Sequence, residues 1–196
     1  KTKVVMTAPF NTRSGYGDHA RSLFYSIMDR EDLQIKCIDT KWGETPRNHL
    51  NEEIPRHKKL LDVLSIDTNL DYRPDIYVDI RIPNEFAQVG RYNLGVTAGV
   101  ETDIVSPEFI EGCNKMNLNI VPSKFTSNTF LGTVYDKTDE QNGQKVKLGE
   151  HKVVKPMVVL SEGVDTDVYK PFDVDENKTE FTNDLNDILK DEDFVY

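Results

Sequence analysis

A glycine-bearing segment near the N-terminus has the residue types of a phosphate-binding turn. It reads Ser14-Gly15-Tyr16-Gly17-Asp18-His19-Ala20 and stands between a short apolar run, Lys3–Thr7, and a stretch with helical spacing, His19–Met28. Glycines in such a turn let backbone N–H groups approach a phosphate closely, and the N-terminus of the following helix adds a favourable partial charge. The segment therefore predicts contact with the phosphate or sugar of a ligand through Gly15, Tyr16 and Gly17.

Two other interpretations of this segment stay open. Its spacing also matches the dinucleotide-binding pattern G-x-G-x-x-A, at Gly15, Gly17 and Ala20. Asp39 then ends the next apolar run, where an acid would hold the ribose of a nicotinamide or flavin cofactor. The long stretch Ala8–Ser14 argues against that interpretation, because in a dinucleotide fold the first glycine follows the strand almost at once. The third interpretation is a flexible turn before a helix that Asp18 caps.

A second group of polar residues, Glu101-Thr102-Asp103, follows the small residues Thr97-Ala98-Gly99 beyond a predicted strand. Two carboxylates and a hydroxyl at a strand's carboxyl end can orient or deprotonate a substrate hydroxyl. The small residues before them leave room for a ligand, so we predict Glu101 and Asp103 as catalytic candidates. The alternative is a helix cap with solvated acids.

A third segment, Ser161–Pro171, has the composition of a turn that leaves a strand toward an interdomain linker. Its side chains either contact substrate or form a hinge without such contact. Among the four histidines, His19 stands in the first turn of the glycine-segment helix and can reach a ligand. The other three lie in polar surroundings and are expected to be solvated: His49, His57 and His151. Trp42 is either a loop anchor or a stacking platform for a sugar.

The elements that would position these residues alternate between strand-like and helix-like patterns. Short apolar runs predict six strands: Lys3–Thr7, Gln34–Asp39, Asp75–Ile82, Tyr92–Val100, Asn119–Pro122 and Val153–Leu160. Helical spacing predicts helices at His19–Met28, near Leu60, Leu61 and Leu64, at Pro107–Met116 with Ser106 as N-cap, and at Lys124–Val134 after Ser123. The polar insertion Asp136–Lys152 carries a hairpin-turn dipeptide, Asn142-Gly143. The alternation predicts an α/β fold, Rossmann-like, with a mainly parallel sheet flanked by helices and ligands beyond the carboxyl ends of its strands.

Composition narrows the function classes. The 196 residues carry a formal net charge of −10, which argues against general nucleic-acid binding and against docking on anionic lipid. No apolar run is long enough to span a bilayer, and no Cys/His spacing is typical of a metal site. Cys37 and Cys113 each stand among apolar residues and are expected to be buried free thiols. A cytoplasmic setting is the default expectation.

The character of the sequence changes after Pro171. The segment Phe172–Tyr196 is strongly acidic, with a possible helix at Thr179–Leu189 and the first residues of a strand at Asp193–Tyr196. We therefore expect an N-terminal domain over residues 1–171. Residues 172–196 would be an acidic linker and the start of a missing C-terminal domain.

Three stretches together resemble the N-terminal domain of the retaining, group-1-type glycosyltransferases of GT-B architecture. They are Ser14–Gly17, the stretch from Ile82–Phe86 through Gly95–Thr102 to Val121–Ser123, and Glu162–Pro171, and the resemblance covers nearly all of residues 3–171. It implies two Rossmann-like domains facing each other across a cleft. The N-terminal domain of that family binds the acceptor, and the C-terminal domain binds most of the nucleotide-sugar.

The resemblance also implies roles for single residues. The glycine segment, here Gly15, Tyr16 and Gly17, reaches the phosphate or sugar of the donor. Acceptor-side contacts fall on Arg13, His19, Thr102, Ser123 and Glu162. Many relatives carry a histidine after the strand that corresponds to Tyr92–Val100, whereas this chain has Glu101-Thr102-Asp103 there, which makes Glu101 the best polar candidate. Enzymes of this architecture usually need no metal and no cofactor beyond the nucleotide-sugar substrate.

The donor-site signatures of that family, a basic pair and an acidic pair, are not found in these 196 residues. The leaving diphosphate would lack its main electrostatic stabilisation, so the chain alone is expected to be inactive as a hexosyltransferase. Two functions of other classes stay open: a nicotinamide-dependent oxidoreductase domain, and a non-catalytic carbohydrate- or protein-binding module. A homo-oligomer is also possible.

Overall fold

The computed structural model describes residues 1–141, 144–166 and 169. The chain divides into two units, Lys1–Glu162 and Gly163–Tyr196, and the helices and strands named below belong to the first. In the second unit, the backbone N–H of Tyr169 donates to the carbonyl of Asp165 at 2.8 Å. The predicted boundary near residue 171, the helix at Thr179–Leu189 and the strand at Asp193–Tyr196 lie outside the described residues.

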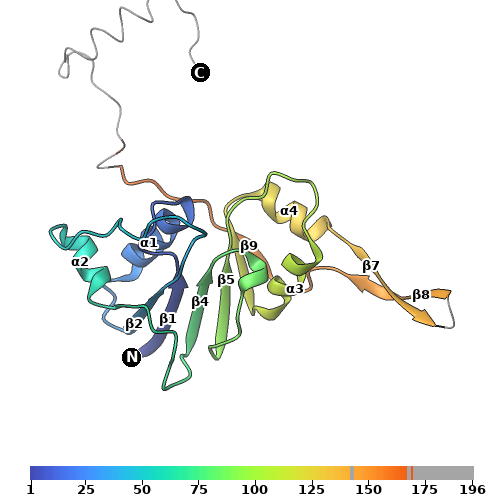
Figure 1. The fold of residues 1–196 in the computed structure, drawn as a ribbon, viewed down its shortest axis with the longest axis horizontal. Helices are drawn as coiled ribbons and strands as arrows, with labels where there is room; N and C mark the ends of the chain where they lie inside the picture. Colours follow the sequence, from blue (N-terminus) through green and yellow to red (C-terminus); the bar gives the residue numbers. More distant parts are fainter. Residues whose placement is uncertain (142–143, 167–168, 170–196) are drawn as a thin grey trace, which may run out of the picture. The chain divides into compact units, whose positions relative to one another are not determined.

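A seven-stranded sheet forms the centre of the first unit, and all its strand pairs are parallel (Figure 1). The strand order is β3-β2-β1-β4-β5-β6-β9, so the chain reverses its direction of travel across the sheet between β1 and β4. The strands are β1 (Thr2–Ala8), β2 (Leu33–Asp39), β3 (Leu64–Ser65), β4 (Ile76–Ile80), β5 (Tyr92–Val96), β6 (Leu118–Val121) and β9 (Met157–Val159). This arrangement confirms the predicted Rossmann-like α/β fold.

The connecting helices are α1 (Gly15–Ile27), α2 (Pro55–Leu61), α3 (Pro107–Lys115) and α4 (Lys124–Gly132), with a 3-10 turn η1 (Pro83–Glu85) after β4. Right-handed crossovers on the two sides of the reversal place α1 and α2 on one face of the sheet and α3 and α4 on the other. Phe24 of α1 and Leu60 of α2 pack with Met6 of β1. Ile110 of α3 and Phe130 of α4 belong to a second cluster. Both faces are therefore covered, but by different helices at the two ends of the sheet.

Helix α1 begins at Gly15, four residues before its predicted start at His19. Ser14 is the N-cap, and its hydroxyl accepts the backbone N–H of Gly17 at 3.1 Å. The interpretation of a flexible turn capped by Asp18 is therefore wrong, because the serine provides a cap four residues earlier. The two glycines lie in the first turn of the helix.

The second predicted helix is also displaced. Helix α2 ends at Leu61, and Leu64, which the sequence placed in a helix, pairs in parallel with Cys37 as part of β3. A strand of two residues is too short to show any periodicity, which explains why the sequence predicted six strands in this sheet rather than seven. Strands β5 and β9 end earlier than predicted, at Val96 and Val159.

The polar insertion forms an antiparallel hairpin of β7 (Tyr135–Gln141) and β8 (Gln144–His151), which projects from the rest of the domain (Figure 1). The predicted turn dipeptide Asn142-Gly143 lies outside the described residues. A register shift between Lys137 and Thr138 marks a bulge in the pair. Near the base of the hairpin, the Tyr135 hydroxyl donates to the carbonyl of Val105 at 2.7 Å, which ties β7 to the segment before α3.

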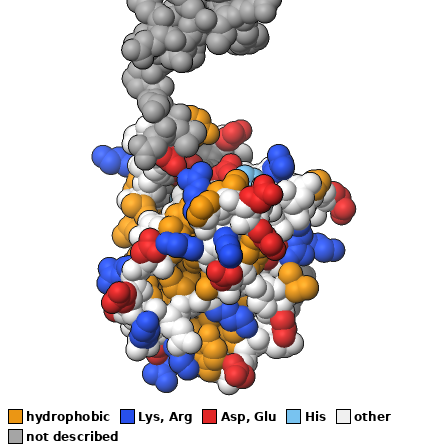
Figure 2. Space-filling view, turned by 90° about the vertical axis from the view of Figure 1, so that its left-hand side faces the viewer, with side chains coloured by type: hydrophobic (Ala, Val, Ile, Leu, Met, Phe, Trp, Pro, Cys, Tyr) orange, Lys and Arg blue, Asp and Glu red, His pale blue; other side chains and the backbone are white. Residues whose placement is uncertain are grey.

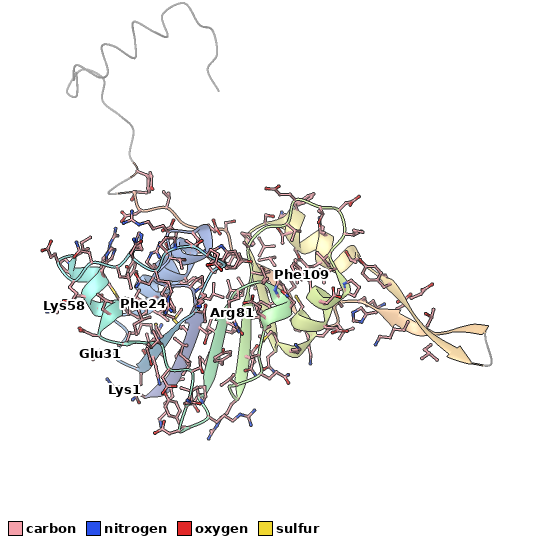
Figure 3. The ribbon with its side chains drawn as sticks, viewed as in Figure 1. Lys1, Phe24, Glu31, Lys58, Arg81 and Phe109 are labelled. Carbon is pink, nitrogen blue, oxygen red and sulfur yellow. The ribbon has the colours of Figure 1, made fainter. Side chains whose placement is uncertain are left out.

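An ion pair between the buried Asp79 and the half-buried Arg81 fixes the turn after β4. The Arg81 Nε donates to Asp79 Oδ1 at 2.6 Å and its Nη2 donates to the carbonyl of Glu85 at 2.7 Å. The backbone N–H of Ala87 donates to Asp79 Oδ2 at 3.0 Å. Burial raises the pKa of the Asp79 carboxyl, and the guanidinium opposes that effect. Figure 3 labels Arg81 between Phe24 on α1 and Phe109 on α3, in the middle of the view.

Cys37 and Cys113 are buried free thiols, as the sequence predicts. Burial raises the pKa of the Cys113 thiol to about 12 and also raises the pKa of Cys37. On the face shown in Figure 2, basic and acidic side chains are interspersed rather than gathered by sign. None of the helices in the described part of the chain combines the length and the apolar character needed to cross a bilayer.

His57 is not solvated, contrary to the prediction. It is buried on α2, its Nδ1 accepts the backbone N–H of Asn51 at 3.2 Å, and its ring lies 5.3 Å from that of His49. His49 and His151 are half-buried. The burial of His57 could not be predicted from its polar neighbours, because the short helix α2 turns this one polar side chain inward beside Leu60.

We expect the protein to lose stability as pH falls from 7 to 5, in part through His57. Burial, with Arg56 nearby, lowers the pKa of its imidazole. The native state therefore binds fewer protons than the unfolded chain, so this contribution is full above about pH 6.5 and is lost as pH falls through the lowered pKa. Urea unfolding of wild type and His57→Gln at pH 7 and pH 5 measures the contribution of His57 to the free energy of unfolding. An unchanged pH dependence in the variant would contradict the assignment.

Candidate functional site

The first turn of α1 presents an open glycine to solvent. In the described part of the chain, the backbone N–H groups of Gly15 and Tyr16 have no acceptor, as the first positions of a helix allow. Gly15 is exposed, and a Cβ built on it would meet no atom within 4 Å. A Cβ on Gly17 would instead come to 2.6 Å from the Thr12 carbonyl oxygen. Packing therefore explains the glycine at 17, whereas it leaves the glycine at 15 unexplained.

Arg21 holds the loop between β1 and this helix. Its side chain is 3% exposed, and Nη1 donates to the carbonyls of Phe10 at 2.6 Å and Thr12 at 2.8 Å. Its Nη2 also pairs with Asp18 on the same helix. A buried guanidinium with three partners makes the loop and the first turn of α1 one rigid element, which pre-positions the open N–H groups.

Asp39, at the end of β2, holds the same loop from the other side. Its carboxylate accepts the backbone N–H of Asn11 at 3.0 Å and the Nε of Arg47 at 2.8 Å, and its side chain is 2% exposed. Arg13 in this loop is exposed and donates from Nε to the Asn48 side chain at 3.3 Å. Both Asp39 oxygens are used within the protein, so this acid is not open to a ribose.

Tyr16 connects α1 to the loop after β5. Its hydroxyl lies 2.9 Å from the Thr97 hydroxyl and accepts the backbone N–H of Ala98 at 3.1 Å. Its ring lies 4.4 Å from that of Trp42, from the loop after β2. Burial raises the pKa of the Tyr16 hydroxyl, and Glu162 adds to the effect. Tyr16 is therefore a protonated phenol at neutral pH that fixes the β5 loop against the helix.

His19 lies one turn further along α1 and meets the segment after β9. Its Nδ1 is 3.6 Å from Glu162 Oε1, and the two side chains are 10% and 54% exposed. Burial lowers the pKa of the imidazole, and the carboxylate opposes this effect. A neutral imidazole beside a carboxylate can accept a hydrogen bond from a substrate hydroxyl while the carboxylate orients the ring.

The acidic loop after β5 is the more exposed part of the predicted site. Glu101 and Asp103 are exposed, and within the described residues neither forms a hydrogen bond or an ion pair. The Thr102 hydroxyl donates to the carbonyl of Ile104 at 2.7 Å. Ser123 is the N-cap of α4, with its hydroxyl accepting the N–H of Thr126 at 3.1 Å. Ser123 thus has a structural role at this edge of the sheet.

At the carboxyl ends of the strands, the structure brings the glycine segment together with Glu162, at the start of the third predicted segment. Gly15, Tyr16, His19 and Glu162 gather there, with the start of the β5 loop between them. The sequence did not predict the supporting roles of four groups at this site: the side chains of Ser14, Arg21 and Thr97 and the Ala98 amide. The i,i+3 pair of Asp18 and Arg21 was a signal for one of them, because an arginine on the apolar side of a helix needs internal partners.

The chemistry of this arrangement is that of holding an anion and a hydroxyl compound side by side. The two open N–H groups at the start of α1 suit an anionic group such as a phosphate. The neutral imidazole of His19 suits a hydroxyl. Among the described residues, no three His, Cys, Asp or Glu side chains come together as a metal site would require.

No protein-family model, no curated protein and no solved structure gave a match to this chain. The fold therefore stands on the chain's own structure, an α/β domain with a seven-stranded parallel sheet and, in its described part, four α-helices.

Proposed function

We propose that this domain is the acceptor-side half of a GT-B-type glycosyltransferase that transfers a sugar from a nucleotide-sugar to an acceptor hydroxyl. The site is the meeting point of α1, the β5 loop and the segment after β9. Its donor-binding counterpart would be a second α/β domain, and the 196-residue chain by itself is expected to be inactive.

One observation carries the proposal. Gly15 is exposed at a capped helix N-terminus, and packing in this structure would also allow a larger residue there. Its own N–H group and that of Tyr16 have no acceptor among the described residues. The Tyr16–Thr97 bond and the His19–Glu162 contact join this turn to the other two stretches that resemble the family. Three stretches far apart in the sequence are thus in contact, as a shared ligand would require.

Within this proposal, Gly15 and Tyr16 offer their N–H groups to the donor phosphate, and a side chain at 15 would crowd it. His19 accepts a hydrogen bond from the acceptor hydroxyl, and Glu162 orients its ring. Glu101 and Asp103 lie on an exposed loop and would act only when the second domain and substrate cover them. No metal is needed, since the helix N-terminus and the counterpart domain supply the positive field.

The oxidoreductase alternative has weaker support. Six residues, 9–14, separate β1 from α1, and the acid that would bind the cofactor ribose is enclosed by Asn11 and Arg47. The binding-module alternative shares the same site and differs only in turnover. A change in nicotinamide fluorescence on mixing would favour the oxidoreductase over the glycosyltransferase. Sugar transfer by the full-length protein would favour the glycosyltransferase over the binding module.

The test is a panel of nucleotide-sugars offered to the full-length protein that contains these residues, read by thermal shift and by transfer. One nucleotide-sugar is expected to raise the unfolding midpoint by mass action and to support turnover. A shift with a nicotinamide cofactor and none with any nucleotide-sugar would overturn the proposal.

Replacing His19 by glutamine is expected to lower the rate of transfer about tenfold to a hundredfold, because the glutamine amide can accept a hydrogen bond but cannot take up the hydroxyl proton as an imidazole can. The nucleotide-sugar thermal shift should persist, since the donor phosphate is held elsewhere. His151→Gln is the matched control, because that ring lies at the hairpin, 3.0 Å from the carbonyl of Pro107. Equal rates for both variants and wild type would remove His19 from the site.

A further inference from the structure

One end of the sheet has helices on a single face. Helices α1 and α2 cover β1 and β2 on the side where Met6 and Ala8 point. In the described part of the chain, the opposite side, where Val5 and Thr7 point, packs against the loop before β4 and the segment after η1. Loops fill a sheet face less completely than helices, and a cavity of about 250 Å³ remains there.

The cavity lies at the carboxyl ends of β1, β2 and β4, on the other face of the sheet from the site on α1. It is lined by three threonines, one tyrosine, one arginine and four apolar residues, namely Thr7, Thr40, Thr68, Tyr77, Arg81, Ile38, Leu70, Ala87 and Val89. Of these residues, Thr68 is exposed. In open α/β sheets, this edge near the reversal of strand order is where ligands bind.

Two hydroxyls in the lining have no partner. Thr7 is 4% exposed, and its Oγ1 forms no hydrogen bond in the protein. Burial raises the pKa of the Tyr77 hydroxyl, and the nearby Thr7 opposes this rise. The geometry between the two hydroxyls nevertheless leaves Thr7 Oγ1 without a hydrogen bond. The Oγ1 of Thr40 is also buried without a partner. Leaving a buried hydroxyl unpaired lowers stability, so two at the wall of one cavity indicate that something else pairs with them.

The charge of the wall restricts what that can be. Among the described residues that line the cavity, Arg81 is the only one with a cationic side chain, and Asp79 neutralises it through Nε and Nη2. An anion would therefore find no free cation. The apolar part of the wall, from Ile38, Leu70 and Val89, favours a ligand with a C–H surface beside its polar edge.

We propose that this cavity binds a small neutral compound rich in hydroxyl groups, such as a monosaccharide or a polyol. Its C–H face packs on the apolar wall, and its hydroxyls pair with Thr7 and Thr40. The site is separate from the site on α1 and does not depend on the function proposed for it.

Water is the competing occupant, since a polar cavity of about 250 Å³ has room for several water molecules. The test uses the purified chain with glycerol, D-glucose and myo-inositol as probes, followed by amide NMR titration. At least one probe is expected to shift the amide signals of Thr7, Thr40 and Ala87 in a saturable way. No saturable shift with any of the three would assign the cavity to water and overturn the proposal.

Variants locate the binding. Thr7→Val and Thr40→Val should each weaken the responding probe about fivefold to tenfold, because each removes one hydrogen-bonding group at constant shape. Ala87→Leu should abolish binding by filling the cavity, and it decides the matter if a valine variant fails to fold. Thr2→Val, in the same strand outside the cavity, is the control. Unchanged affinity in Ala87→Leu would overturn the proposal.

Discussion

Replacing Gly112 by alanine is expected to destabilise the domain severely, by about 3 kcal/mol or more. Gly112 is buried in α3, where a Cβ would overlap the carbonyl carbon and oxygen of Pro83 in η1. The obstacle is backbone, which cannot rotate away as a flexible side chain can. Chemical unfolding of wild type and variant measures the difference.

Gly132→Ala is the matched control for that experiment. Gly132 is also helical, in α4, but a Cβ there would meet no atom within 4 Å. Its replacement should leave the free energy of unfolding unchanged or raise it by up to about 1 kcal/mol, because alanine is the better helix former. Equal effects at 112 and 132 would mean that the contact between α3 and η1 is not as close as the structure has it.

Replacing Gly15 by alanine is expected to leave stability intact and to lower sugar transfer by the full-length protein about tenfold to a hundredfold. The free chain has room for the added methyl group. A phosphate bound to the N–H groups of Gly15 and Tyr16 would occupy that space and clash with the methyl group. Steady-state kinetics together with thermal unfolding separate the two effects.

Two further variants serve as controls for this prediction. Gly132→Ala makes the same chemical change away from the site and should transfer sugar as wild type does. Gly17→Ala should lose stability as well as activity, because its Cβ would collide with the Thr12 carbonyl. Full activity in Gly15→Ala would show that no ligand approaches that position, and the proposed function would lose its main support.

The fold could be predicted from the sequence wherever an element was long enough to show its period. The strands Lys3–Thr7 and Gln34–Asp39 and the helix containing Ala20, Leu23 and Phe24 all stand where their patterns indicated. The missed seventh strand has a physical cause. A strand as short as Leu64–Ser65 has no period of its own and exists only because β2 offers it a partner.

The sequence predicted residues of the candidate site but not the groups that hold them. Gly15, Tyr16 and His19 were predicted from residue type and position and Glu162 from the resemblance, and in the structure His19, on the same helix as Tyr16, contacts Glu162. The groups that hold them, such as the Ala98 amide, are backbone atoms with no sequence signature. Trp42, whose role the sequence left open, lies against Tyr16, an arrangement that depends on tertiary packing alone.

The pairing of β1 with β4 also has a consequence for how the chain reaches this structure. The backbone N–H of Lys3 donates to the carboxylate of Asp75 across 72 positions of sequence, at the start of that pairing. Closing so long a loop costs entropy before the contact stabilises anything, so we expect the β1–α1–β2 unit to form early and the joining of β4 to limit the rate. During synthesis on the ribosome, β1, α1 and β2 would emerge well before β4, the strand that pairs with β1 at the centre of the sheet.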